Sequence, residues 1–320
     1  MIKEGILNIN KPQNMTSHDV VAIVRKCTGI KKVGHTGTLD PMATGVLPVC
    51  IGKSTRIIEY LDMDIKKYRC KMILGLETDT QDIWGKVLKR ESTDRITESD
   101  IRKAFEKFHG VISQKPPMYS ALKVNGKKLY EYAREGKKVE VKSRNIYIKS
   151  LDIEDISLGD EKTVTFTVEC SKGTYIRTIC QDAGTALGCS AVLCELTRLS
   201  SGKFDLSEGI TIDELREMSK EEIEKKLYST DYPLDKFGKV ETDEVNSVRF
   251  VNGWHLDLSD CRILKRPVYE NEDFYLPIRD EYRRAYNIYG TVFGKKCFLG
   301  VAFYNNKYKK LVADKVFYSR

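Results

Sequence analysis

Short apolar runs, separated by glycine, proline and polar positions, mark out the first quarter of the chain. Residues 5–10 (GILNIN), the apolar run 46–51 and the alternating run 68–74 each predict a strand. Apolar residues at positions 20, 23, 24 and 27 keep helical spacing. Thr16 or Ser17 is placed to cap that helix, Asp19 completes a capping-box pattern, and Gly29 is placed to end it. This part of the chain therefore predicts strands interrupted by a well-capped helix.

The middle of the chain continues with helices and hairpin-like strands. Amphipathic or well-bounded segments predict helices at 97–108, with Thr97 as cap, and at 174–187, closed by Gly188. Residues 146–153 and 163–170 predict two neighbouring strands, and two short acidic helices are expected within 211–227. Because the regular strand–helix–strand rhythm is absent, the fold class predicted is α+β, with a mixed, largely antiparallel sheet and flanking helices.

Beyond about residue 240 the pattern changes to short β-type runs. The runs 248–251, 286–293, 297–304 and 311–317 are separated by turns such as 304–307. They predict a small all-β unit, a compact barrel. We therefore expect two domains, at 1–235 and 241–320.

Composition narrows the class of protein. The chain has 320 residues, of which 41% are hydrophobic and 31% charged, as in globular proteins. No apolar run approaches the roughly 18 residues needed to span a bilayer, and the N-terminus has no stretch of signal-peptide length. Nine scattered cysteines without a Cys-x-x-Cys pair, and four dispersed histidines, argue against a disulfide framework and a zinc site. We expect a cytoplasmic protein without membrane contact or bound metal.

The net charge of +8 is unevenly distributed. Residues 114–150 hold ten lysines or arginines against three glutamates, whereas residues 204–235 hold ten acids against four bases. A basic segment in an otherwise balanced protein is typical of a polyanion partner. Tyrosines lie among these lysines, and single-stranded RNA favours aromatic platforms. The alternative is a solvated charged loop, which is the commonest outcome for such a run. The basic insertion is placed at about 114–145, with a short helix near 129–134.

Residues 34–48 are the most unusual stretch. They contain three glycines and two prolines, which argue against a helix or a regular strand and predict a loop of fixed conformation. Asp40 precedes Pro41, which favours an extended backbone that holds the carboxylate out from the loop. Taken alone, an Asp-Pro turn that only starts the next strand is the more common outcome.

Five segments together resemble one family. Residues 35–56 (HTGTLDPMATGVLPVCIGKSTR) are similar to the signature loop of the TruB family of tRNA pseudouridine synthases. Four more segments resemble the same family in the same order: Lys11-Pro12-Gln13, Lys67-Tyr68-Arg69, residues 118–123 (MYSALK) running on to Gly136, and residues 171–177 (SKGTYIR). They cover roughly residues 5 to 205, and five motifs in order are hard to obtain by accident.

The resemblance implies conversion of uridine 55 in the T loop of tRNA to pseudouridine. The reaction breaks the C1′–N1 bond, turns the base and rejoins C1′ to C5, without redox change or energy source, so no cofactor is expected. The resemblance gives the role of catalytic aspartate to Asp40, as nucleophile or acid/base group. Whether Asp40 attacks C6, attacks C1′ or only assists proton loss stays open.

Two further catalytic residues follow from the resemblance. Arg177, in the Tyr-Ile-Arg motif, would orient Asp40 by charge and forked hydrogen bonds, the alternative being a surface arginine on a helix. Tyr68 would stack on the target uracil, as the matching family residue does. From the residues alone, Tyr68 is a core tyrosine.

The resemblance also implies substrate contacts. His35 would occupy the space left by the extruded base, because a uridine in folded tRNA must leave its stack before chemistry. Tyr175 would contact the substrate or pack as a helix-start aromatic, and Leu196 would line the uracil pocket, although from the residues alone it is a core leucine. Lys11 would contact phosphate or brace the Asp40 loop, the alternative being a solvated lysine.

The basic insertion would form a flap over the RNA stem-loop, with Lys127 and Lys128 among its contacts. The C-terminal unit occupies the place of the PUA-like RNA-binding domain of the family. Asp79 and Asp82 suggest a magnesium pair, but no other ligand signal accompanies them, and we interpret them as structural. The expected partner is the tRNA T stem-loop, bound by a monomer without a guide RNA.

Two other functions are considered. The first is an RNA-binding or RNA-folding protein that has lost the chemistry, against which Asp40, Arg177 and Tyr68 argue because a binder needs none of them. The second is a glycosylase that hydrolyses the same bond and releases free uracil.

Overall fold

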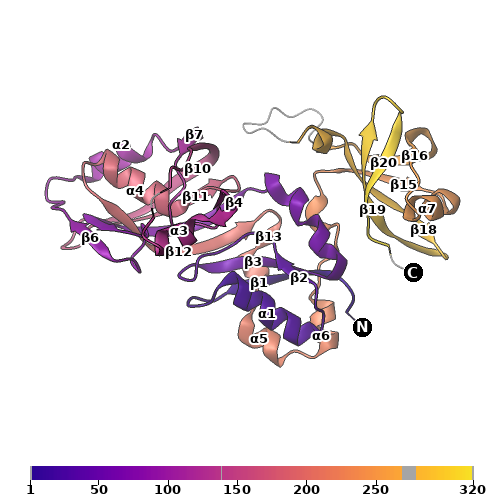
Figure 1. Cartoon of the computed structure of the whole chain (residues 1–320), viewed down its shortest axis with the longest axis horizontal. Coiled ribbons are helices and arrows are strands. Elements are labelled where there is room, and N and C mark those ends of the chain that lie inside the picture. Colours follow the sequence, from indigo (N-terminus) through magenta and orange to yellow (C-terminus); the bar gives the residue numbers. More distant parts are fainter. Residues whose placement is uncertain (1, 138, 269–278, 319–320) are drawn as a thin grey trace.

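Two β-sheets organise the protein (Figure 1). The computed structural model describes residues 2–137, 139–268 and 279–318. A ten-stranded sheet draws its strands from residues 5–211, and a six-stranded sheet draws its strands from residues 238–316. No helix in these described ranges is long and apolar enough to cross a membrane.

The large sheet is mixed and mainly antiparallel, which confirms the predicted fold class. Its strands follow the order β14-β1-β3-β12-β4-β11-β10-β7, with β13 beside β12 and β2 beside β3. Among its described strands, β1 with β14 and β3 with β12 pair in parallel. The strands are β1 (Gly5–Lys11), β2 (Val33–His35), β3 (Thr44–Ile51), β4 (Lys66–Leu74), β7 (Gly110–Gln114), β10 (Arg144–Ser157), β11 (Thr163–Cys170), β12 (Ala191–Ser201), β13 (Phe204–Asp205) and β14 (Ile210–Thr211).

Helices flank this sheet and two small hairpins extend from it. Helix α1 lies with α5 and α6 near β1 and β3, and α4 packs beside β12 and α2 (Figure 1). The helices are α1 (Ser17–Thr28), α2 (Glu98–Phe105), α3 (Leu129–Arg134), α4 (Ile176–Ala186), α5 (Ile212–Glu217) and α6 (Lys220–Lys225), with the 3₁₀ segments η1 (Gly52–Met63), η2 (Leu206–Glu208) and η3 (Tyr232–Leu234). The hairpins pair β5 (Leu76–Thr78) with β6 (Val87–Arg90) and β8 (Lys123–Val124) with β9 (Lys127–Lys128).

The C-terminal sheet has the strand order β16-β20-β19-β18-β15-β17. One segment of this domain that we predicted as a strand is a helix. Residues 248–251 belong to α7 (Glu244–Val251), so the β prediction for them was wrong. Asp243 caps this helix by accepting from the Asn246 N–H at 2.7 Å. The remaining elements are β15 (Gly238–Thr242), β16 (Leu256–Asp257), η4 (Leu258–Asp260), β17 (Arg262–Lys265), η6 (Asp280–Arg284), β18 (Ala285–Val292), β19 (Lys295–Asn305) and β20 (Lys310–Val316).

Local capping signals specify several helix ends as predicted. The Thr16 side chain accepts from the Asp19 N–H at 3.1 Å, and the Asp19 carboxylate accepts from the Thr16 N–H at 2.8 Å. Gly29 ends α1 with φ +74°, a conformation that costs glycine little. Such a cap contributes about 1 kcal/mol to helix stability. Helix α1 is therefore fixed at both ends beside the loop that follows it.

An apolar core joins the two sheets. Ile6 of β1 and Val46 of β3 belong to the same buried cluster as Phe237, Tyr282 and Phe317. We propose the two-domain division expected from the sequence, at 1–235 and 241–320, and the pairing of β15 with β18 supports a C-terminal unit of its own.

Candidate active site

The loop that holds Asp40 is shorter than the sequence predicted. Strand β2 reaches His35 and strand β3 begins at Thr44, so residues 36–43 are the irregular part. The pairing of β2 with β3 continues into the Gly- and Pro-rich stretch. There the Pro48 carbonyl accepts from the Thr36 N–H at 3.0 Å. The expectation that residues 34–48 exclude a strand was therefore wrong at its start, where β2 includes residues 34–35, whereas the strand predicted at 46–51 is confirmed and begins two residues earlier.

Hydrogen bonds hold this loop on each side of Asp40. The Leu39 N–H donates to Ser17 Oγ at 2.9 Å, and Ser17 Oγ donates to the Leu39 carbonyl at 3.1 Å. The Asn14 N–H donates to the Pro41 carbonyl at 2.9 Å. The start of α1 thus fixes the backbone that carries the Asp40 carboxylate.

Lys11 lies beneath the loop with its side chain fully buried. Its Nζ donates to the carbonyls of Met15 at 2.7 Å and Pro12 at 2.8 Å, and more weakly to that of Pro41 at 3.5 Å. Burial lowers the pKa of Lys11 to about 8, and the nearby Asp40 charge partly opposes this shift. Of the two roles expected for Lys11, bracing the loop is the one with visible contacts, and substrate contact stays a prediction.

Arg198, which sequence reasoning did not single out, clamps the other end of the loop. Its side chain is fully buried, and it donates from Nε to the Val46 carbonyl at 2.6 Å and from Nη2 to the Gly37 carbonyl at 3.2 Å. Gly45 has φ +100°, and a Cβ there would lie 2.2 Å from the Arg198 carbonyl oxygen. Only glycine therefore permits this close approach of the two strands.

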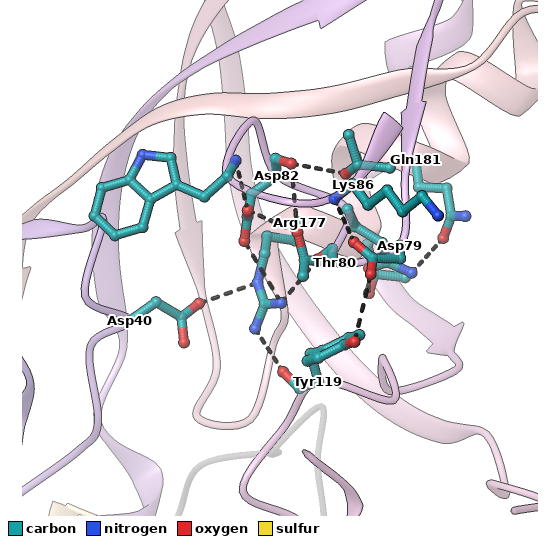
Figure 2. A network of polar contacts seen from close by, with 12 residues as sticks. Asp40, Asp79, Thr80, Asp82, Lys86, Tyr119, Arg177 and Gln181 are labelled. Carbon is teal, nitrogen blue, oxygen red and sulfur yellow. Dashed lines mark hydrogen bonds and ion pairs between the residues drawn. The ribbon is translucent and has the colours of Figure 1, made fainter. Parts of the chain in front are cut away.

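The structure brings Asp40 and Arg177 together (Figure 2). Arg177 Nε lies 3.0 Å from Asp40 Oδ2, with the arginine side chain 6% exposed and the carboxylate 38% exposed. Arg177 also donates from Nη1 to the Thr80 carbonyl and from Nη2 to the Tyr119 carbonyl, each at 2.9 Å. One ion pair and two hydrogen bonds to three separate segments thus fix the guanidinium. The Asp40 carboxylate that it contacts is still partly exposed to solvent.

Asp82 is also part of this network, where its contacts are those of a structural residue. Its Oδ2 lies 3.8 Å from Arg177 Nη1, and its Oδ1 accepts from Thr80 Oγ1 at 2.8 Å and from the Trp84 N–H at 3.1 Å. Burial raises the pKa of Asp82. The contact between Asp82 and Arg177 joins segments that are far apart in the chain, so no local sequence pattern predicts it.

Tyr68 and Leu196 lie in the adjacent strands β4 and β12. Tyr68 in β4 stands opposite Arg198 in β12, and Leu196 stands opposite Cys70. Each side chain is only 8% exposed, and burial raises the pKa of the Tyr68 phenol. Their roles in holding the uracil stay predictions.

His35 lies at the end of β2, partly buried against His18. The two rings meet edge to face with centroids 5.5 Å apart, and His35 Nδ1 is buried without a hydrogen-bond partner among the described residues. Burial lowers the pKa of His35 to about 4, with the charges of His18, Arg198 and Lys66 acting in the same direction. His35 is therefore neutral at pH 7.

This lowered pKa predicts a loss of stability in acid. An unfolded histidine titrates near 6.5 and folded His35 near 4, so between these pH values the unfolded chain binds a proton that the folded chain does not. Urea unfolding at pH 7.5 and pH 5 should show a smaller acid-induced loss in His35→Gln than in wild type. His109→Gln, at an exposed position, is the control. An equal loss in both variants would contradict the assignment.

Both ends of the basic insertion reach Tyr175, which precedes α4. The buried Gln114 side chain accepts from the Tyr175 N–H at 2.8 Å and donates to its carbonyl at 3.1 Å. The Arg144 guanidinium lies 5.0 Å from the centroid of the Tyr175 ring. Gln114 was not recognised from the sequence. The contact of Tyr175 with substrate stays a prediction.

Within the insertion, cations lie over aromatic rings. Lys127 Nζ lies 5.0 Å from the Tyr132 ring centroid and pairs with Glu135, and Lys128 Nζ lies 5.4 Å from the Tyr130 ring centroid. The predicted helix is present as α3. This arrangement offers both charge and flat surfaces to a polyanion.

Comparisons with known proteins identify the family of the chain. Residues 25–176 match the model of the TruB family pseudouridylate synthase N-terminal domain, and residues 177–237 match that of the tRNA pseudouridylate synthase B C-terminal domain. A curated relative from Clostridioides difficile, named tRNA pseudouridine synthase B, is 47% identical over 84% of this chain and 89% of its own. A relative of the same name from Clostridium perfringens is 44% identical over 87% of this chain and 95% of its own.

Solved structures resemble the fold. An H/ACA RNP bound to a substrate RNA containing 2′-deoxyuridine contains a chain with a TM-score of 0.68 and 23% identity, covering 99% of this chain and 86% of that one. The fold and the matches define a pseudouridine synthase. The chain belongs to the TruB family, and the predicted family and enzyme class are confirmed.

Proposed function

We propose that this chain converts uridine 55 in the T loop of tRNA to pseudouridine, with Asp40 as the catalytic carboxylate. The observation that carries the proposal is the Asp40–Arg177 pair, in which a buried guanidinium orients a carboxylate that solvent and substrate can reach. The relatives named tRNA pseudouridine synthase B match most of both chains, which supports tRNA as the substrate class.

In this proposal one set of residues orients the catalytic carboxylate and the other binds the RNA. Arg177 balances the charge of Asp40 and fixes its direction, so that little reorganisation is needed when the carboxylate meets the base. Tyr68 supplies a flat ring for the extruded uracil, and neutral His35 fills the gap left in the RNA without an added charge. Leu196 lines the pocket, Tyr175 contacts the substrate beside it, and Lys11 holds the loop. The enzyme acts in the cytoplasm as a monomer on the T stem-loop without a guide RNA.

Release of tritium from C5-labelled tRNA tests this function. Joining C1′ to C5 must expel the hydrogen at C5, so wild-type protein should release tritium stoichiometrically. Free uracil without tritium release would indicate a glycosylase. Tight binding without either product would indicate an RNA-folding protein.

The basic insertion is expected to bind RNA through its charges. Changing Lys127, Lys128 and Lys137 to Gln should weaken tRNA binding and flatten its salt dependence. The log–log slope should fall by about 0.7–0.9 for each phosphate that the protein no longer neutralises. Lys138, which the sequence groups with them, lies outside the described residues.

Filter binding over a range of salt concentrations measures this slope. A matched control changes Lys220, Lys225 and Lys226 to Gln, which removes the same charge from the acidic segment 204–235. If the insertion variant keeps the wild-type slope, the insertion does not bind phosphate.

A further inference from the structure

A tryptophan stands half-exposed at the edge of the site. Trp84 lies in the turn between β5 and β6, with 49% of its surface exposed, and its neighbour Ile83 is 39% exposed. Large aromatic side chains exposed on a fixed loop commonly mark a binding surface. None of the roles in the proposed reaction uses this side chain.

The backbone under Trp84 is tightly held. Its N–H donates to Asp82 Oδ1 at 3.1 Å, and the Ile83 N–H donates to the Leu193 carbonyl at 3.0 Å. A Cβ at Gly85 would lie 2.3 Å from Thr80 Oγ1, so the chain is closely packed after the tryptophan as well. A ring carried on such a turn loses little entropy on binding, which favours its use as a contact.

The same turn joins the catalytic pair and the basic insertion. The Asp82 carboxylate that fixes Trp84 also faces Arg177, and Arg177 contacts Asp40 (Figure 2). Tyr119, near the start of the insertion, accepts from Arg177 through its carbonyl and donates its hydroxyl to Asp79 at 3.4 Å. The backbone of Trp84 is thus connected to Asp40 through Asp82 and Arg177.

The surroundings of Trp84 suit a nucleotide. Trp84 and the neighbouring Ile83 present an exposed apolar surface on this turn, which is what stacking on a base requires. When a uridine leaves the stack, each neighbouring base loses a stacking partner. A flat indole replaces that partner for any base, because every base has a π-face.

We propose that Trp84 stacks on a base that flanks the target uridine and so helps to hold the opened T loop. This inference rests on the proposed function, since it assumes that the uridine is extruded at Asp40. It makes Trp84 a substrate-binding residue, with the stacking energy stabilising bound RNA.

Fluorescence isolates this contact, because the chain has two tryptophans. In Trp254→Phe the emission comes from Trp84, and unmodified T stem-loop RNA should quench it by about half or more, with saturation at the RNA concentration that saturates turnover. In Trp84→Phe the emission comes from Trp254, which lies beyond α7 in the C-terminal sheet domain and reports separately on any contact of that domain with the RNA. An unquenched Trp84 in a complex that turns over normally would overturn the proposal.

Kinetics of tritium release separate stacking from simple packing. Trp84→Leu, which is apolar but not flat, should raise KM for the stem-loop about 10-fold with little change in kcat, whereas Trp84→Phe should stay within about threefold of wild type. Equal KM values in the two variants would contradict stacking. If RNA quenches Trp84 but wild type releases no tritium, the stacking inference stands and the proposed isomerisation fails.

Discussion

Asp40→Asn should abolish tritium release from C5-labelled tRNA while tRNA affinity stays within about threefold of wild type. The amide has the shape of the carboxylate and its oxygen can face the Arg177 guanidinium in the same place, but it cannot act as the nucleophile or base. Removing such a group costs roughly 10⁴-fold or more in turnover. Affinity is preserved because phosphate contacts elsewhere supply most of the binding free energy.

Single-turnover tritium release and filter binding, measured on the same preparations, test both halves of this prediction. Asp235→Asn is a matched control, because Asp235 is also a partly exposed aspartate (43%) facing a cation, Lys203 at 3.9 Å. It should turn over like wild type. A large loss of affinity with residual turnover in Asp40→Asn would show that Asp40 binds RNA and does not carry the chemistry.

The sequence predicted those parts of the fold that depend on neighbouring residues. The cap formed by Thr16 with Asp19, the end of α1 at Gly29 and the helix 129–134 each follow from a few adjacent side chains. The run 248–251 shows the limit of such reasoning. Four apolar-rich positions do not distinguish a strand from a buried helix face, and the Asp243 cap decided the outcome in favour of the helix.

The site was predictable to a smaller extent, because its contacts join segments far apart in the chain. The resemblance placed Asp40 and Arg177 in one site, and the structure places their side chains 3.0 Å apart. Gln114 and Arg198 were missed, and Asp82 was named only as structural, because nothing near them in the sequence indicates their partners. Burial, which follows only from the fold, turned these ordinary polar residues into supports for the loop and the guanidinium.

Arg177→Lys should lower kcat by about 100-fold or more, although it keeps the positive charge and should leave tRNA affinity near that of wild type. A guanidinium reaches Asp40, the Thr80 carbonyl and the Tyr119 carbonyl with three nitrogens in one plane. An ammonium is a single point on a flexible stem and cannot meet all three partners. The carboxylate would then lose its fixed direction, and loss of orientation lowers kcat more than binding.

Tritium release at saturating tRNA measures this effect on kcat directly. Arg216→Lys is the matched control, because Arg216 is an exposed arginine that pairs with Asp213 on the surface of α5, where an ammonium serves as well. Thermal unfolding of both variants distinguishes a misplaced carboxylate from a damaged fold. If Arg177→Lys keeps wild-type kcat, then charge alone suffices at this position. The two hydrogen bonds from Arg177 to the Thr80 and Tyr119 carbonyls would in that case stabilise the fold, because they connect residues 79–82 to the start of the insertion.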